Sequence, residues 1–371
     1  LSPGNGLVAA KLGKMTVNSN LSLSGKTNIE FDIIPSSAYK NDSILINGNF
    51  TATGINNIVI KTLSGTLPAG TFSLIKWTGN LSGTVDNFNI EGISGIPVSL
   101  LIENNTLKLV INAVRSSGKV SWTGTENSNW DFVSGNFKLA ENPTYFVTGD
   151  SVTVNDAAIA KAIVLTDNFS TSNLLFENAA SAILVKGAGG FSGTGNLEKT
   201  GRGLLNIETV NNNYTGKTLL TNAMVQVAAL SDAGTAGSLG SASIAPENFV
   251  LTNSKLIINA TTTNSNRGMS LIGNDTINVP KSNGVVSITG QVIGAGKLVK
   301  NGTGQLNLSG SLANTYTGGT VISGGTIGLG SLVMNTLGLG TGNISLENGG
   351  RISMFYSTAG YNQKTNRNIN I

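Results

Sequence analysis

An all-β solenoid is the fold class that the sequence predicts, and three observations lead to it. Residues that favour strands (Val, Ile, Thr) and turns (Asn, Gly, Ser) dominate, whereas those that favour helices are sparse. The chain repeats itself in tandem, and turn residues recur at the same place in each repeat. Because each coil of a solenoid touches only its neighbours, a chain of 371 residues can form one such structure without the usual limit on domain size.

The composition restricts both the core and the possible partners. Aromatic residues make up 6% of the chain, so the expected core consists of Val, Ile, Leu and Ala. The net charge of +4 comes from scattered groups without a block of Lys or Arg, which argues against nucleic acid as a partner. No run approaches the roughly 18 apolar residues of a membrane-spanning helix. With no Cys in the chain, the redox compartment cannot be inferred.

The strongest internal match pairs residues 193–228 with residues 294–330. After one inserted residue, Tyr214-Thr215-Gly216 matches Tyr316-Thr317-Gly318. The other matched residues of the first copy are Gly193, Gly195, Leu197, Lys199, Gly201, Gly203, Leu205, Asn206 and Ile207, and those of the second are Gly294, Gly296, Leu298, Lys300, Gly302, Gly304, Leu306, Asn307 and Leu308. The repeat is therefore about 100 residues long, and such self-similarity is typical of solenoids.

Each repeat is a series of short strands separated by Gly and Asn turns. In a stacked coil each side chain lies on its equivalent in the next coil, about 4.8 Å away. Thin aliphatic residues suit the interior, and Gly suits corners with positive φ. We therefore expect Gly203 and Gly304 at equivalent positions one repeat apart. Four side chains should point inward: Leu205, Ile207, Leu306 and Leu308.

Changes in composition and motif suggest three modules. They are residues 1–116, a β-rich module; residues 117–240, a first repeat module; and residues 241–371, a second repeat module. The main alternative is that residues 1–116 form a separate antiparallel domain.

The pattern GxGxLxKxGxGxLxLxG followed by NTYTGGT, at residues 294–330, resembles the autotransporter-associated (passenger-associated) β-strand repeat of large bacterial exported proteins. Leu1-Ser2-Pro3-Gly4-Asn5 resembles the element that ends a block of such repeats, so the first module would close a preceding block. Residues 122–131 resemble the opening of the next block. The copy at 193–228 is degenerate, with Lys217 and Asn222-Ala223 where Gly is usual. The resemblance implies a right-handed parallel β-helix, a cell-surface or secreted location, and a role in export, display or adhesion without catalytic residues or cofactors.

An enzyme is the main alternative, because polysaccharide lyases and hydrolases use the same fold. Their sites need clustered carboxylates that bind Ca²⁺ or act as an acid–base pair. Here the acidic residues are dispersed, and Asp150 and Asp156 come nearest to a pair. The glycines of residues 193–203 lack the GK[ST] sequence of a phosphate loop, and no GGxGxD run for calcium occurs. We therefore predict no catalytic, cofactor or metal residues; the alternative is a carbohydrate-active β-helix with its site on loops or outside this segment.

Five aromatic residues have two possible roles. Tyr214 and Tyr316 could stack on sugar rings, but packing over the coil is the favoured interpretation. Trp77, Trp122 and Trp130 pose the same question, and Trp122 and Trp130 are expected to cap a module junction.

Three tripeptides resemble the Asp-[Ser/Thr]-aliphatic acceptor of O-glycosylation in one group of bacteria. They are Asp42-Ser43-Ile44, Asp150-Ser151-Val152 and Asp275-Thr276-Ile277. Such tripeptides also arise by chance in a chain rich in Ser and Thr.

The end of the sequence repeats an earlier step, because Asn366-Arg367 matches Asn266-Arg267. The strands that follow Asn266-Arg267 have no counterparts before Ile371, so the apolar positions Ile369 and Ile371 would end an uncapped coil. We therefore expect the polypeptide to continue beyond Ile371 and to begin before Leu1, and the isolated fragment to associate end to end.

Together these observations predict a non-catalytic structural or adhesive segment of a large bacterial surface or secreted protein. Its partners would be neighbouring repeats of the same polypeptide and surface glycans or host matrix molecules. The sequence does not identify the ligand.

Overall fold

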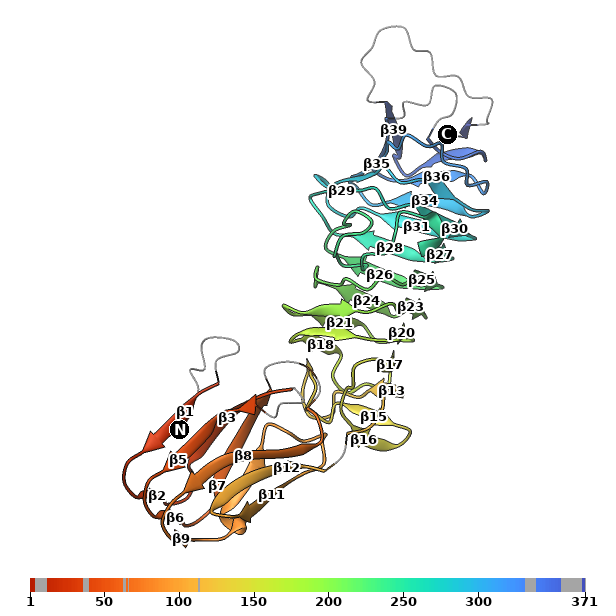
Figure 1. Ribbon diagram of the computed structural model, residues 1–371. Coiled ribbons are helices and arrows are strands. Elements are labelled where there is room, and N and C mark those ends of the chain that lie inside the picture. The colour runs from red at the N-terminus through yellow and green to blue at the C-terminus, as the bar shows by residue number, and fades with distance from the viewer. Residues whose placement is uncertain are drawn as a thin grey trace. The chain divides into compact units, whose positions relative to one another are not determined.

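The computed structural model describes residues 1–3, 12–35, 40–62, 65, 67–112, 114–330, 338–354 and 369–370. In this part of the chain the regular structure is β, apart from two short 3-10 turns, Val85–Asn87 and Pro246–Asn248, and most strand pairs are parallel (Figure 1). No helix of the described residues is long and apolar enough to cross a membrane. The chain divides into two compact units: unit 1 comprises Leu1–Gly118 and Thr125–Thr148, and unit 2 comprises Lys119–Gly124 and Gly149–Ile371.

Unit 1 begins with three layers of strands. Their bounds are β1 Lys14–Val17, β2 Leu21–Leu23 and β3 Asn28–Ile34; β5 Ser43–Ile46, β6 Phe50–Ala52 and β7 Asn56–Thr62; and β8 Gly70–Trp77, β9 Leu81–Ser82 and β10 Phe88–Glu91. Equivalent strands pair in parallel as β1-β5-β8, β2-β6-β9 and β3-β7-β10. Lys14 pairs with Ser43, and Ile44 pairs with Ile75, so each layer uses about 30 residues.

Among the described residues, each antiparallel pair of unit 1 includes at least one strand outside the rows β1-β5-β8, β2-β6-β9 and β3-β7-β10. The hairpin of β11 (Val98–Glu103) and β12 (Thr106–Ile111) adds to β8, and β4 (Lys40–Asn41) adds to β3. Two further strands, β15 (Phe137–Leu139) and β16 (Asn142–Thr144), pair with each other, and β14 covers Asn129–Trp130. Unit 1 is therefore a mainly parallel structure rather than the antiparallel domain considered as an alternative.

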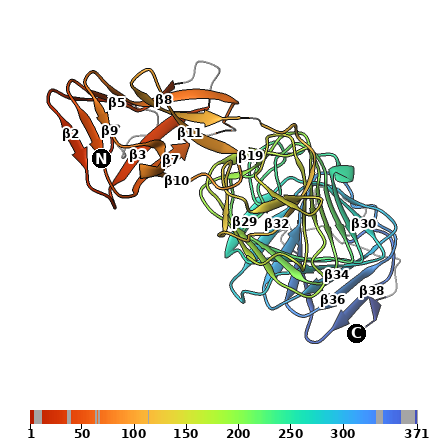
Figure 2. The ribbon, with the colours of Figure 1, turned by 90° about the horizontal axis from the view of Figure 1, so that it is seen from below.

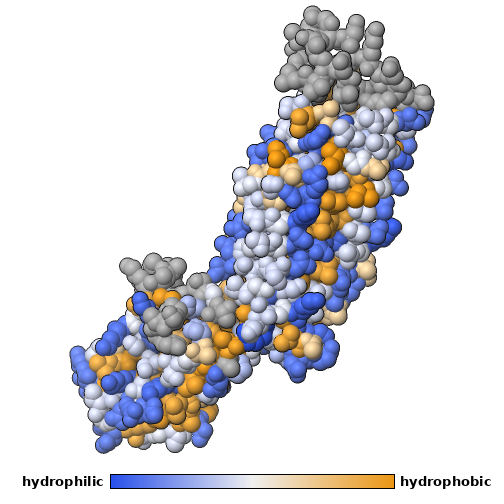
Figure 3. Space-filling view, turned by 45° about the vertical axis from the view of Figure 1, so that its right-hand side comes forward, coloured by the Kyte–Doolittle hydropathy of each residue, from blue (hydrophilic) through white to orange (hydrophobic). Residues whose placement is uncertain are grey.

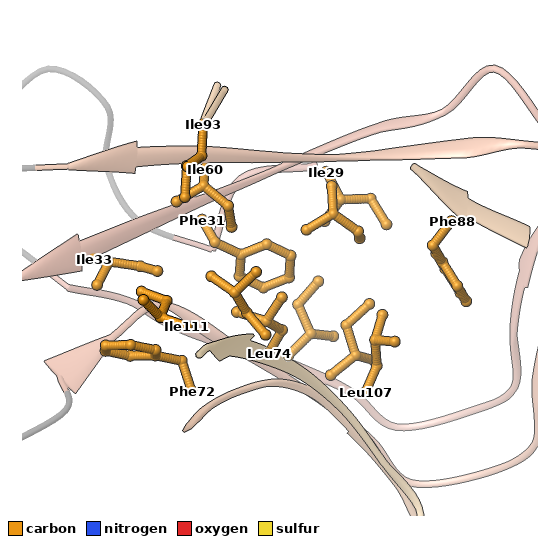
Figure 4. Close-up of a cluster of buried hydrophobic side chains, with 14 of the residues drawn as sticks. Ile29, Phe31, Ile33, Ile60, Phe72, Leu74, Phe88, Ile93, Leu107 and Ile111 are labelled. Atoms are coloured by element: carbon orange, nitrogen blue, oxygen red, sulfur yellow. The ribbon is translucent and has the colours of Figure 1, made fainter. Parts of the chain in front are cut away.

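The core of unit 1 lies between its three sheets. Figure 4 shows Ile29, Phe31 and Ile33 of β3 facing Phe72 and Leu74 of β8. The alternation of β3, in which Ile29, Phe31 and Ile33 are buried and their neighbours are not, follows from the period of two along a strand. Aromatic residues also enter this core, with the rings of Phe50 and Trp77 5.4 Å apart. The prediction of a core built from Val, Ile, Leu and Ala is therefore wrong for unit 1, and unit 2 also buries aromatic side chains such as Phe169, Phe176 and Phe191.

Unit 2 is a stack of short parallel strands on three sides (Figure 1, and from below in Figure 2). The first sheet runs β13-β17-β20-β23-β25-β27-β30-β33, and the second runs β18-β21-β24-β26-β28-β31-β34-β36-β38-β40. The third side carries β19-β22 and β29-β32-β35-β37-β39. The neighbouring strands in these rows pair in parallel, which is consistent with a β-helix.

The strands of unit 2 are short and similar in length. On the first sheet they are β13 Lys119–Trp122, β17 Ser151–Val154, β20 Asn173–Phe176, β23 Leu197–Thr200, β25 Thr218–Thr221, β27 Phe249–Thr252, β30 Met269–Ile272 and β33 Val292–Ile293. On the second they are β18 Ala162–Leu165, β21 Ile183–Lys186, β24 Leu204–Ile207, β26 Met224–Val227, β28 Lys255–Ile258, β31 Asn274–Asn278, β34 Lys297–Asn301, β36 Thr320–Ser323, β38 Ile344–Glu347 and β40 Ile369–Asn370. On the third side they are β19 Asn168–Ser170, β22 Gly190–Ser192, β29 Thr262–Ser265, β32 Val285–Ile288, β35 Gln305–Leu308, β37 Thr326–Leu329 and β39 Arg351–Met354.

The interior of unit 2 consists of columns of stacked side chains. On the second sheet, one column runs in register through Ile183, Leu205, Val225, Leu256, Ile277, Lys300 and Ile322. Leu205, Ile207, Leu306 and Leu308 are each at most 1% exposed, which confirms that they point inward. Parallel register therefore stacks aliphatic side chains on one another, with Lys300 as the exception in this column, as the aliphatic-rich sequence predicts.

The two sequence copies lie on different sides of the stack. The strands that contain Leu197 and Leu205 belong to the first and second sheets, whereas those that contain Leu298 and Leu306 belong to the second sheet and the third side. On the first sheet, β23 is followed by β25, β27, β30 and β33, so four layers separate β23 from β33. The next strand in the chain, β34, belongs to the second sheet, and the second copy therefore begins one side later than the first. The local surroundings are nevertheless alike: the N–H groups of Gly203 and Gly304 donate to carbonyl oxygens one layer below, at 3.1 and 3.0 Å.

Several predictions at the chain ends fall outside the described residues. These are the roles of Gly4, Asn5, Asn366, Arg367 and Ile371 and of the Ile369 side chain.

The stacking in unit 2 can be tested on two neighbouring residues of β28. Leu256 is fully buried in its column, and Ile257 faces outward and is half-buried. Leu256→Ala should lower the free energy of unfolding by about 2–5 kcal/mol, because it leaves a cavity between Val225 and Ile277. Ile257→Ala should cost about 1 kcal/mol or less. Urea denaturation of both variants measures the difference, and equal losses would contradict the assigned register.

Candidate functional site

The described residues provide no cluster of acidic side chains for metal binding or acid–base catalysis. No group of three or more His, Cys, Asp or Glu among them could hold a metal ion. Asp150 is fully buried, whereas Asp156 is exposed, so the two carboxylates that came nearest to a pair lie in different environments. Asp156 accepts hydrogen bonds from the N–H groups of Ser181, Ala179 and Ala180, and these bonds lower its pKa to about 2. A carboxyl with so low a pKa holds no proton for acid catalysis near neutral pH.

Two of the three aspartates in the Asp-[Ser/Thr]-aliphatic tripeptides, Asp42 and Asp275, bind backbone N–H groups. Asp42 accepts from the N–H groups of Gly13 and Asp32, at 2.6 and 3.1 Å. Asp275 accepts from Ser254 and Ile272, at 2.9 and 2.8 Å, and burial raises its pKa to about 6. Both side chains are fully buried where a strand begins, so they satisfy backbone groups at corners. Glycosylation at the neighbouring hydroxyl groups stays a prediction.

Two buried lysines, one in each sequence copy, occupy inward positions. Lys199 stacks between Phe176 and Leu220, and Lys300 between Ile277 and Ile322. Neither side chain has any exposed surface. An aliphatic stem thus fills a core position while the ammonium group reaches the corner that follows the strand.

The ammonium groups of these lysines bind the carbonyl oxygens of adjacent corners. Lys300 Nζ donates to Asn301 O and Gly302 O at 2.9 Å each, and to Gly324 O, one layer away, at 3.3 Å. Lys199 Nζ donates to Gly201 O at 2.6 Å, to Asn178 O at 3.0 Å, and to Thr200 O. Burial lowers the pKa of each lysine to about 8, which leaves the charged form in the majority at pH 7. The motif lysine therefore joins two layers at a corner.

The Asn-x-Tyr-Thr-Gly segment of each copy forms a second buried contact. Tyr214 and Tyr316 are 2% and 0% exposed, and their hydroxyl groups lie 2.8 and 2.7 Å from the Oγ1 atoms of Thr218 and Thr320. These tyrosines therefore pack inside unit 2, as the favoured interpretation predicted, and present no face to a sugar.

A buried asparagine two residues before each tyrosine links three layers. Asn212 Oδ1 accepts from Phe191 N at 2.8 Å, and its Nδ2 donates to Ser238 O at 3.0 Å. Asn314 makes the matching bonds, with Val292 N at 2.8 Å and Gly338 O at 2.6 Å. The role of these asparagines was not predicted, although their fixed spacing before Tyr is a usable sequence signal.

The three tryptophans are also buried. Trp122 donates from Nε1 to Ala160 O at 3.1 Å within unit 2. Trp130, in unit 1, lies edge-on to Phe137 with ring centroids 4.9 Å apart. Trp77 packs on Phe50. None of the three offers an open ring to a ligand, and their capping of a module junction stays a prediction.

Arg267 anchors the chain between β26 and β27, where residues 228–248 leave the sheets. Its guanidinium donates to Ser231 O at 3.0 Å and to Thr235 O at 3.5 Å, and it also binds Gly240 O. Asn266 adds two bonds to the same segment, with Ala233 N and with the Asp232 carboxylate. Asn266-Arg267 therefore fastens an excursion of the chain to the next layer.

Comparison with known proteins agrees with this geometry. The model of the passenger-associated-transport-repeat family matches residues 197–227 and 298–329, the stretches that contain the buried lysine, tyrosine and strand pairs. These two stretches are similar to passenger-associated-transport-repeats. The resemblance seen in the motif residues is therefore confirmed.

One curated relative extends the passenger-repeat comparison. Over 140 residues the chain is 39% identical to the Adhesin BmaC autotransporter of Brucella suis biovar 1 (strain 1330). The matched region is 37% of this chain and 4% of that protein, so the chain spans a small part of the relative's length. No solved structure matches the chain significantly.

The corner lysine of the second passenger repeat can be tested by Lys300→Met. The variant keeps an apolar stem but removes the donor to three carbonyl groups, so the free energy of unfolding at pH 7 should fall by about 1–3 kcal/mol. Lys297→Met, at an outward position of the same strand, should change it little. Thermal and urea unfolding provide the measurement, and a Lys300→Met variant as stable as the parent would contradict the role.

The pH dependence of stability should follow from the same lysines. Between about pH 8 and 10 the folded lysines lose protons that the unfolded chain retains, so the free energy of unfolding should rise with pH. Above that window, burial of Tyr214, which raises its pKa, opposes the rise. Lys300→Met should show a smaller rise than the parent, whereas Lys297→Met should retain it. A flat profile in the parent would contradict this prediction.

Arg267→Met tests the anchoring of residues 228–248. Loss of the guanidinium should free this segment, so elastase should cut within it many times faster while the sheets stay intact. Arg351→Met, which removes an exposed arginine, is the matched control. Mass spectrometry locates the cuts, and unchanged protection of residues 228–248 would argue against the anchor.

Proposed function

We propose that this chain is a non-catalytic, adhesive segment of a large passenger-type protein displayed on the outer surface of a bacterium. Its scaffold would be a right-handed parallel β-helix whose sequence repeats about every 100 residues. The observation that carries the proposal is that both passenger repeats use their polar motif residues for contacts between layers. Such a segment extends and presents a surface, and its recurring residues serve the scaffold.

The buried groups support a structural assignment. The motif lysines, tyrosines and asparagines of both copies bind backbone or hydroxyl groups inside unit 2. The exposed carboxylate of Asp156 is held by three backbone N–H groups. Polar groups that bind the backbone in this way serve the scaffold.

The relative supports adhesion as the role of the displayed surface, since the matched protein is named an adhesin of the autotransporter class. A stack of parallel layers also suits display, because its length grows with the number of repeats. The outer face in Figure 3 carries lengthwise bands of hydrophilic and hydrophobic residues on unit 2, a surface that a large partner could contact over many layers.

Adhesion and catalysis can be tested on the same purified chain. Beads coated with the native chain should adhere to host cells or extracellular matrix, whereas beads coated with heat-denatured chain should not. Pectins and glycosaminoglycans incubated with the chain, with or without Ca²⁺, should release no unsaturated or reducing ends. Absence of adhesion would contradict the proposed function. Release of sugar ends that Asp150→Asn or Asp156→Asn abolishes would show an enzyme instead.

A further inference from the structure

A small pocket on unit 2 lies at the corner between the first and second sheets. It has a volume of about 190 Å³ and spans several successive layers. Its polar lining comprises Arg202, Asn222, Asn253, Ser254, Lys255, Asn274 and Thr276. The strands beneath it are fixed in register, with Met224, Lys255 and Thr276 paired in succession.

The pocket is electropositive. Arg202 is exposed and Lys255 is half-buried, and neither side chain makes a hydrogen bond or ion pair with another described residue. The lining contains no carboxylate. Asp275 is adjacent in sequence but fully buried, and its two oxygens accept from Ser254 and Ile272. Two cationic groups therefore face solvent in one small concavity without an acidic partner on its surface.

The asparagine corner adds oriented donors. Asn253 has a φ of 50°, a conformation that Asn tolerates better than most residues. Its Oδ1 accepts from Asn274 N at 3.0 Å, so its orientation is fixed and its Nδ2 group stays available as a donor. Asn222, one layer away, has the same φ of 50°. The layers thus place amide groups next to the two cations on a rigid backbone.

We propose that this pocket binds an anionic substituent, a sulfate or a carboxylate, of an acidic polysaccharide. Guanidinium, ammonium and amide N–H groups are the donors that such oxyanions accept, and charge-assisted bonds are the stronger ones. The volume suits one charged substituent with part of a ring, because pockets for larger ligands start at about 300 Å³. The rest of the polysaccharide would run along the outside of the stack. The inference rests on the proposed function, since a displayed adhesive segment meets surface glycans.

Three hexasaccharides test the proposal: one sulfated, one with uronate but no sulfate, and one neutral. Calorimetry or thermophoresis with the full chain should show that both acidic sugars bind and the neutral one does not. Affinity should fall as NaCl rises from about 50 to 300 mM, because salt screens exposed charges. Arg202→Gln and Lys255→Gln should each weaken binding about threefold to fivefold, and the double variant about tenfold or more.

Lys186→Gln is the matched control, because Lys186 is an exposed lysine of the same sheet outside the pocket. Its affinity should stay within about twofold of the parent. Three outcomes would overturn the proposal: no binding of acidic sugar, equal binding of the neutral sugar, or an equal loss in Lys186→Gln. Circular dichroism of each variant separates lost binding from lost folding. If the coated beads still adhere while the pocket fails these tests, the adhesive function stands and the pocket assignment falls.

Discussion

Parallel, in-register stacking of successive layers is the constraint on which the rest of this structure depends. It brings each inward side chain directly over its equivalent, so a column must be filled by residues that pack on their own kind. The column from Ile183 to Ile322 meets this demand with aliphatic residues at all but one position. The exception, Lys300, is tolerated because its stem packs like an aliphatic chain and its charge leaves the column at a corner.

The second constraint is the hydrogen bonding of the corners, because the backbone there leaves the sheets and its polar groups lose their partners in the neighbouring strands. The passenger repeats meet it with a small set of side chains, each of which binds groups on more than one layer. Lys300 and Asn314 are examples. Arg267 extends the same solution to a longer excursion of the chain. The polar residues of the motif therefore make contacts that hold neighbouring layers together.

The same layout explains why the surface is free to carry function. The recurring residues lie in the inward columns and at the corners. Outward positions such as Lys255 and Thr276 face solvent and can vary without loss of the stack. Binding sites on such a scaffold arise where outward residues of adjacent layers share the same charge or hydrogen-bonding groups. The pocket that holds Arg202 and Lys255 has this origin: Arg202 occupies a variable position between two motif glycines of the first copy, where the second copy has Thr303, and Lys255 lies outside both copies.

From the sequence alone, the strand-rich composition, the tandem motif and the inward positions of Leu205 and Leu306 could be predicted, because each follows from local propensity and a period of two. The burial of Tyr214 and Tyr316 was likewise within reach. The bond from Lys199 to Asn178 O and the bonds of Asn212 and Arg267 were not, because they join residues about 20 to 36 positions apart that meet only when layers stack. The aromatic core of unit 1 and the shift of the two copies onto different sides of unit 2 also depended on that stacking. Local sequence thus determined which residues form strands, and only the tertiary structure decided which strands become neighbours, since the lengths of the intervening corners set that pairing.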